Sequence, residues 1–150
     1  MRAIESVYKE FCKEPFILPS DEMLAQVEHR IGSILPKSFR EYLLKYNGGM
    51  FSEPKIVSPG TLQSVGRLTF MKGVGVRPRT VCLATDHDLA IFDNNFPVKL
   101  LPIGHTLAGD LILLLLGGAQ HGEIAIKHAF TDSYELLASD IEGFFESLRR

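Results

Sequence analysis

The chain has 150 residues, of which 45% are apolar and 23% are charged, and its formal net charge at pH 7 is −2. We therefore expect one globular domain with its own core, and this composition excludes disordered, collagen-like and disulfide-scaffold proteins. The longest apolar run, Leu111–Leu116, is too short for a membrane helix, and the charged N-terminal segment predicts no signal peptide.

Three helices are expected in the N-terminal third. Apolar side chains recur at helical spacing over Ile4–Phe11. A second helix is expected between an N-cap at Ser20 and a stop at Gly32. A third is expected from Pro36 to Asn47-Gly48-Gly49, where the residues tolerate positive φ.

The middle and C-terminal thirds favour strands. Short strands are expected at 55–57 and 67–71, whereas residues 79–94 favour a helix only weakly. Three further strands are expected at 99–103, 110–116 and 123–129, the second of them buried on both faces. A closing helix is expected from a cap at Ser139 or Asp140 to Leu148. This order predicts an α+β fold, with N-terminal helices and a C-terminal helix packed on a central, mainly antiparallel sheet.

The charge is unevenly distributed along the chain. Between Pro54 and Thr85 there are five cations and no acid, so this segment carries +5 and the remainder −7. Three interpretations stay open: a solvated face, a docking surface for an acidic partner, or a nucleic-acid site. A single aromatic residue, Phe70, and the mildly acidic total disfavour nucleic acid. The five cations are Lys55, Arg67, Lys72, Arg77 and Arg79.

Motifs for catalysis or cofactor binding are missing from the sequence. Its five histidines have no metal-ligand spacing, so we predict no metal site. A nucleophile elbow and a phosphate-binding loop are also missing, and we predict no cofactor. Cys82 is interpreted as a small core residue, and two cysteines without motif spacing suit a cytoplasmic setting.

The loop Gly104–Asp110 has two interpretations. It could present polar groups to a ligand, or it could be a hairpin connection whose Asp110 binds backbone amides. His105 and His128 could meet across the sheet beside it. Asp86-His87-Asp88 is interpreted as a helix start with capping acids.

Three blocks in the chain resemble the SUKH superfamily, which includes fungal cell-wall glucan-synthesis regulators and bacterial immunity proteins. The C-terminal block, Leu136–Phe145, is similar to the closing helix of the family, and the middle block is similar to its "LLPIG…GG(N/D)" segment. The middle block is Leu100-Leu101-Pro102-Ile103-Gly104 followed by Ala108-Gly109-Asp110. The N-terminal block is Val27-Glu28-x-x-Ile31-Gly32-x-x-Leu35-Pro36-x-x-Phe39-Arg40-x-x-Leu43-Leu44-x-x-Asn47-Gly48-Gly49.

This resemblance implies an α+β fold over residues 1–150 and a helix within 79–94. It also implies structural roles for the motif residues Leu35, Pro36, Asn47, Gly48, Gly49, Pro102, Gly104, Gly109 and Phe144. The chain departs from the family in two places. Many members have a tryptophan, an acid and a histidine where this chain has Ile126-Lys127-His128, and Ala108 replaces the first glycine of the usual pair.

The resemblance implies a non-catalytic protein-binding module of the immunity type, whose partner would be a cognate toxin. A regulatory scaffold is the alternative, and a small enzyme using His105, Asp110 and His128 is a third hypothesis. The partner is expected to be a protein rather than a membrane or a nucleic acid. Candidate partner-binding residues are Arg67, Lys72, Arg77, Arg79, Asp86, Asp88, His105, Asp110 and His128.

Overall fold

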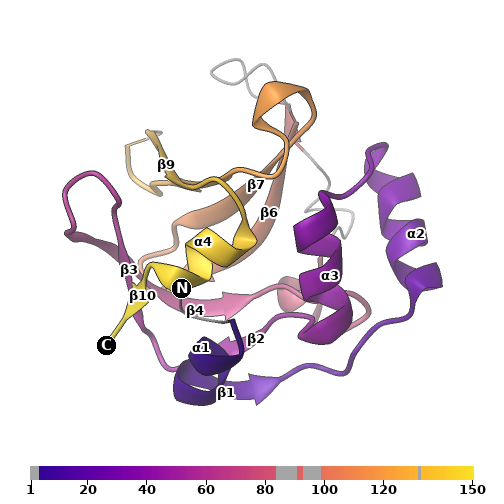
Figure 1. The fold of residues 1–150 in the computed structure, drawn as a ribbon, viewed down its shortest axis with the longest axis horizontal. Helices are drawn as coiled ribbons and strands as arrows, with labels where there is room; N and C mark the ends of the chain where they lie inside the picture. Colours follow the sequence, from indigo (N-terminus) through magenta and orange to yellow (C-terminus); the bar gives the residue numbers. More distant parts are fainter. Residues whose placement is uncertain (1–3, 84–90, 93–98, 132) are drawn as a thin grey trace.

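The computed structural model describes residues 4–83, 91–92, 99–131 and 133–150 (Figure 1). Within them lie the helices α1 (Ile4–Phe11), α2 (Asp21–Ile31), α3 (Lys37–Lys45) and α4 (Ile141–Glu146). The strands are β1 (Cys12–Pro15), β2 (Gly49–Phe51), β3 (Lys55–Val57), β4 (Ser64–Met71), β5 (Ile91–Phe92), β6 (Lys99–Thr106), β7 (Leu111–Leu116), β8 (Ile124–Lys127), β9 (Tyr134–Ala138) and β10 (Leu148–Arg149).

The named strands form one antiparallel sheet. Its main path runs β1-β2-β4-β6-β7-β8-β9, while β3 pairs with β4 and β10, and β5 pairs with β6. The hairpins β6–β7, β7–β8 and β8–β9 follow one another in sequence, so they form a meander at the C-terminal end of the path. This arrangement confirms the predicted α+β fold with a mainly antiparallel sheet.

The helices pack on one face of the sheet and build the main core with it. Figure 1 shows α4 lying across β6 and β7, with α2 and α3 standing next to each other beyond it. Phe144 and Phe145 of α4 are fully buried together with Ile112 and Leu114 of β7. Burying a side chain of this size contributes about 1.5–3 kcal/mol, so α4 is a major source of stability.

The opposite face of the sheet carries a smaller apolar cluster. Because side chains alternate along a strand, Leu113 and Leu115 point away from the helices and pack with Leu100 and Ala125. Ile112, Leu114 and Leu116, which point toward the helices, belong to the main core. The prediction of a strand buried on both faces is therefore confirmed for β7.

Helix ends follow the predicted signals. The hydroxyl of Ser20 accepts a hydrogen bond of 3.2 Å from the Met23 amide, and Gly32 ends α2 with φ +69°. The carboxylate of Asp140 accepts a bond of 2.8 Å from the amide of Gly143, so Asp140 rather than Ser139 caps α4.

The prediction of a helix within 79–94 is wrong at both of its described ends. Arg79–Val81 forms a single 3₁₀ turn, and Ile91–Phe92 is strand β5, paired with β6. Beyond the 3₁₀ turn, the amide of Leu83 donates to the carbonyl of Gly73, and the amide of Gly73 donates to the carbonyl of Val81. These bonds hold the chain around Cys82 beside Gly73. Such pairing of distant segments outweighs a weak local helical pattern. Residues 84–90 and 93–98 lie outside the described residues.

Candidate partner-binding site

The turn between β6 and β7 contains a buried carboxylate. One oxygen of Asp110 accepts a bond of 3.0 Å from the Thr106 hydroxyl, which in turn accepts one from the amide of Asp110. The other oxygen accepts a bond of 2.9 Å from the amide of Ala129, in the turn between β8 and β9. Gly109 completes the first turn with φ +91°. The interpretation of this loop as a hairpin connection is confirmed, and the Asp110 carboxylate binds one backbone amide, that of Ala129, together with the Thr106 hydroxyl.

His128 lies beside this carboxylate. Its Nδ1 is 4.0 Å from an oxygen of Asp110, and its side chain is 28% exposed. The amide of His128 donates to the carbonyl of Ser133, which closes the turn between β8 and β9. Asp110 and His128 therefore come together where two hairpin turns meet.

His105 lies on the other face of the sheet. It is paired with Leu111, which is paired with Lys127, so these three residues share one face. The imidazole of His105 stacks on the ring of Phe70, with 4.7 Å between the ring centroids. His105 and His128 therefore do not form one site, and the arrangement required by the enzyme hypothesis is not present.

The cationic segment is divided between exposed and buried positions. Arg67 and Arg77 are exposed, whereas the side chain of Lys72 is 2% exposed and therefore cannot reach a partner's surface. Arg79 begins the 3₁₀ turn. The remaining two candidates, Asp86 and Asp88, lie outside the described residues.

Arg67 lines a cavity of about 320 Å³ near the C-terminus. Its guanidinium donates a bond of 3.0 Å to the carbonyl of Glu53. Arg150 on the same cavity forms an ion pair of 3.0 Å with Glu10. One arginine of this cavity is thus paired with an acid, and the other is bound to backbone.

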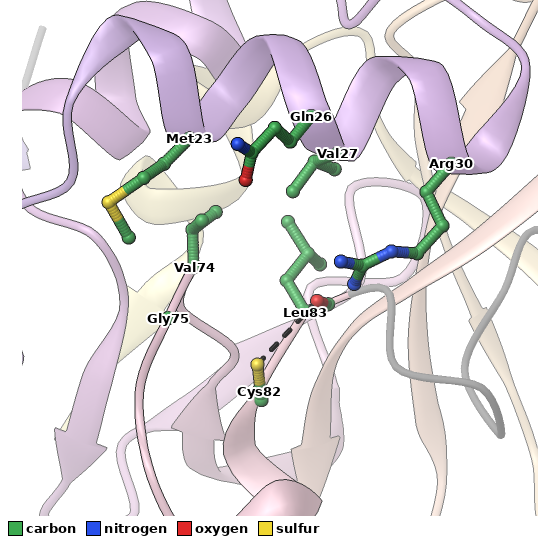
Figure 2. Close-up of a pocket in the computed structure, with 8 residues that line it drawn as sticks. All are labelled: Met23, Gln26, Val27, Arg30, Val74, Gly75, Cys82 and Leu83. Carbon is green, nitrogen blue, oxygen red and sulfur yellow. Dashed lines mark hydrogen bonds between the residues drawn. The ribbon is translucent and has the colours of Figure 1, made fainter.

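A second cavity, of about 160 Å³, lies between α2 and the segment after β4 (Figure 2). Met23, Val27 and Arg30 project from α2 toward Val74 and Leu83 on the other wall. The half-buried thiol of Cys82 donates to the carbonyl of Leu83 at 3.7 Å. Sequence reasoning missed this cavity, because it forms only when residues far apart in the chain pack together.

The N-terminal motif block holds the helical layer against the sheet. Asn47 is fully buried with φ +55°, and its amide bonds the carbonyls of Ile17 and Val74 and the amide of Val74. The hydroxyl of Tyr8 lies 2.7 Å from that of Tyr42 and donates to the carbonyl of Gly48 at 3.1 Å. Burial raises the pKa of both tyrosines, because it disfavours the charged phenolate.

The other motif residues lie at packing and turn positions. Leu35 and Phe144 are buried in the core, and Pro36 immediately precedes α3. Pro102 is buried in β6 opposite Leu113. The remaining residues are glycines: Gly104 lies so close to Met71 that an added Cβ would be 2.8 Å from its sulfur, and Gly49 has φ +146°.

The sequence model of the SMI1 / KNR4 family (SUKH-1) matches residues 18–147. The chain belongs to this family. Membership supports an immunity-type or regulatory protein-binding module. No curated protein and no solved structure matches the SUKH-1 chain.

Two observations concern metals and membranes. In residues 4–83, 91–92, 99–131 and 133–150, no group of three or more His, Cys, Asp or Glu side chains is placed to hold a metal ion. Each helix in these ranges is too short or too polar to cross a bilayer.

Proposed function

We propose that this SUKH-1 chain is a non-catalytic immunity protein that acts in the cytoplasm by binding and neutralising a cognate bacterial toxin. The observation that carries the proposal is the match of the family across residues 18–147. The described geometry is compatible with it, because the polar motif residues are engaged in holding the fold. Asn47 and Asp110, for instance, bond backbone groups of distant segments.

A binding role requires a stable scaffold and a surface whose charge and shape suit one partner. The layered core supplies the scaffold, and the hairpin turns and the exposed cations Arg67 and Arg77 supply candidate contacts. Both arginines stay proposals as partner-binding residues, as do His105 and His128. Asp110 is buried, and both of its carboxylate oxygens are bonded within the protein, so it is not accessible to a partner.

The test is co-expression of the chain with proteins encoded by adjacent genes, scored for rescue of growth and for co-purification. We expect one toxic neighbour whose toxicity is suppressed and which co-purifies with the chain. Phe144→Asp, which places a charge in the core, is the unfolded control and should not rescue. Co-purification of several partners without any rescue would contradict the immunity role and favour a regulatory scaffold.

A further inference from the structure

The cavity between α2 and the segment after β4 has a buried apolar floor and an exposed polar rim (Figure 2). Val27, Val74 and Leu83 form the floor and are 3%, 5% and 1% exposed. Gln26 and Arg30, which line the cavity from α2, are exposed. A dry apolar centre inside a polar rim is typical of interface pockets that hold an anchor side chain of a partner.

The volume of this cavity limits its occupant to one ring-sized group. The cavity measures about 160 Å³. Sites for drug-sized ligands usually measure about 300–1,000 Å³, which is considerably larger. An apolar protein cavity of about 150 Å³ binds benzene. A single side chain carried by a larger partner therefore fits, and it can enter from solvent because the rim is exposed.

Three groups on the walls favour an aromatic ring over an aliphatic chain. The thioether of Met23 and the thiol of Cys82 both line the cavity and are half-buried. Contacts between sulfur and an aromatic ring are favourable. Figure 2 shows the guanidinium of Arg30 extending from α2 toward Leu83, at the edge of the cavity. A guanidinium placed there can lie against the face of a bound ring, which is a cation–π contact.

Hydrogen bonds hold the wall opposite α2 in place. The side-chain oxygen of Asn47 accepts a bond of 2.8 Å from the Val74 amide. The carbonyl of Gly73 accepts one of 2.8 Å from the Leu83 amide, which joins the two stretches of chain that form this wall. Arg77, an exposed candidate partner-binding residue, lies between these stretches in the sequence. The cavity is therefore preformed, and a preformed site loses less entropy when it binds.

We propose that this cavity, here named the α2 pocket, receives one aromatic side chain of a protein partner. The inference rests on the proposed function as a protein-binding module, and it adds the place where the partner is anchored and the kind of side chain that anchors it. A free small aromatic molecule shares the same ring chemistry, so the experiment separates the two sources.

The first probe is a random peptide library displayed on phage and selected on the purified full-length chain. We expect the enriched peptides to share a Phe, Tyr or Trp, and replacing that residue by Leu should weaken binding in fluorescence anisotropy by about tenfold. Met23→Leu and Arg30→Gln should each weaken it by about threefold. His29→Gln is the matched control, because His29 is exposed on the same helix and does not line the cavity. It should leave affinity unchanged.

A ring attached to Cys82 should occupy the α2 pocket directly. In a Cys12→Ser background, Cys82 is the one remaining cysteine. Benzyl methanethiosulfonate then attaches a benzylthio group to it, whereas methyl methanethiosulfonate attaches only a methylthio group. We expect the benzyl form to lose about tenfold or more in peptide affinity and the methyl form to keep its affinity. Thermal melting of each form and variant ensures that a loss of binding is not a loss of fold.

Four outcomes would overturn the α2 pocket: no enrichment, enriched peptides without a shared aromatic residue, equal binding by the benzyl and methyl forms, or binding by Met23→Leu and Arg30→Gln equal to that of the control. Binding of p-cresol without any enriched peptide would assign the cavity to a free small molecule and would also overturn it. The rescue assay is separate: a wild-type chain that rescues nothing contradicts the immunity role, whereas the library and the labelled forms decide the pocket.

Discussion

Two buried polar side chains, Asn47 and Asp110, both form hydrogen bonds to distant segments of the chain, but they do so in different surroundings. Asn47 bonds the backbone of Ile17 and Val74, and Asp110 bonds Thr106 and the backbone of Ala129. Each side chain thus ties together segments that are distant in sequence. A buried polar group that finds partners in this way specifies one arrangement of the chain, because leaving it unbonded is costly.

The glycines beside these two residues show how the space around them differs. A Cβ on Gly48 would lie 2.4 Å from the carbonyl oxygen of Met71, whereas a Cβ on Gly109 would meet nothing within 4 Å. The Asn47 region is therefore closed and serves the core. The Asp110 region is open, so the same kind of hydrogen bonding there joins two turns at the surface of the protein.

The largest effect is expected for Gly48→Ala. The substitution combines φ +78° with a clash against backbone, so we expect a loss of about 3 kcal/mol or more in the free energy of unfolding. Chemical denaturation measures it. Gly60→Ala is the control, since a Cβ there meets nothing within 4 Å and no positive φ is involved. Equal midpoints for the two variants would show that the Asn47 region is not closed.

Asp110→Ala should follow, with a loss of about 2 kcal/mol, because the Thr106 hydroxyl and the Ala129 amide lose their acceptor. Hydrogen exchange at the Ala129 amide should accelerate, since that amide no longer has an internal partner. Exchange at the Val74 amide, which is bonded to Asn47, is the internal reference. Unchanged protection of Ala129 would contradict the role of Asp110 in joining the two hairpin turns.

Gly109→Val should cost less, about 1.5 kcal/mol, because φ +91° is strained for a side chain but the surrounding space is open. Thermal melting of Gly109→Val and Gly48→Ala side by side compares strain alone with strain plus a clash. A melting temperature for Gly109→Val equal to that of the wild type would exclude the strain.

The last prediction concerns alkaline pH, and at neutral pH its effect on stability is zero. Because burial raises the pKa of Tyr8 and Tyr42 above the ordinary value of 10.0, the folded chain keeps protons that the unfolded chain releases. Stability is therefore complete below about pH 10 and falls above it, by about 1.4 kcal/mol per pH unit for each tyrosine. Denaturation across this range checks the slope, which Tyr42→Phe should reduce. A stability that does not change with pH there would contradict the burial effect.

Sequence reasoning succeeded where the signal is local. Ser20, Gly32 and Asp140 act as predicted, because a cap or a stop depends on a few neighbouring residues. The strands β1, β2 and β9 were missed, since short segments carry too little periodicity and are defined by the strands with which they pair. The candidate site was found in part: Asp110 was identified from its loop, but its bond to the Ala129 amide in the next hairpin was not.

The amino-acid sequence by itself determined the α+β class, the helix ends, the strand β7 buried on both faces and the family resemblance. All of these depend on spacing along the chain or on the identity of neighbouring residues. Only the tertiary structure decided that Lys72 is buried, that His105 and His128 lie on opposite faces, and that one carboxylate joins two turns. These facts depend on strand register, which places residues from distant segments opposite each other and cannot be derived from local pattern.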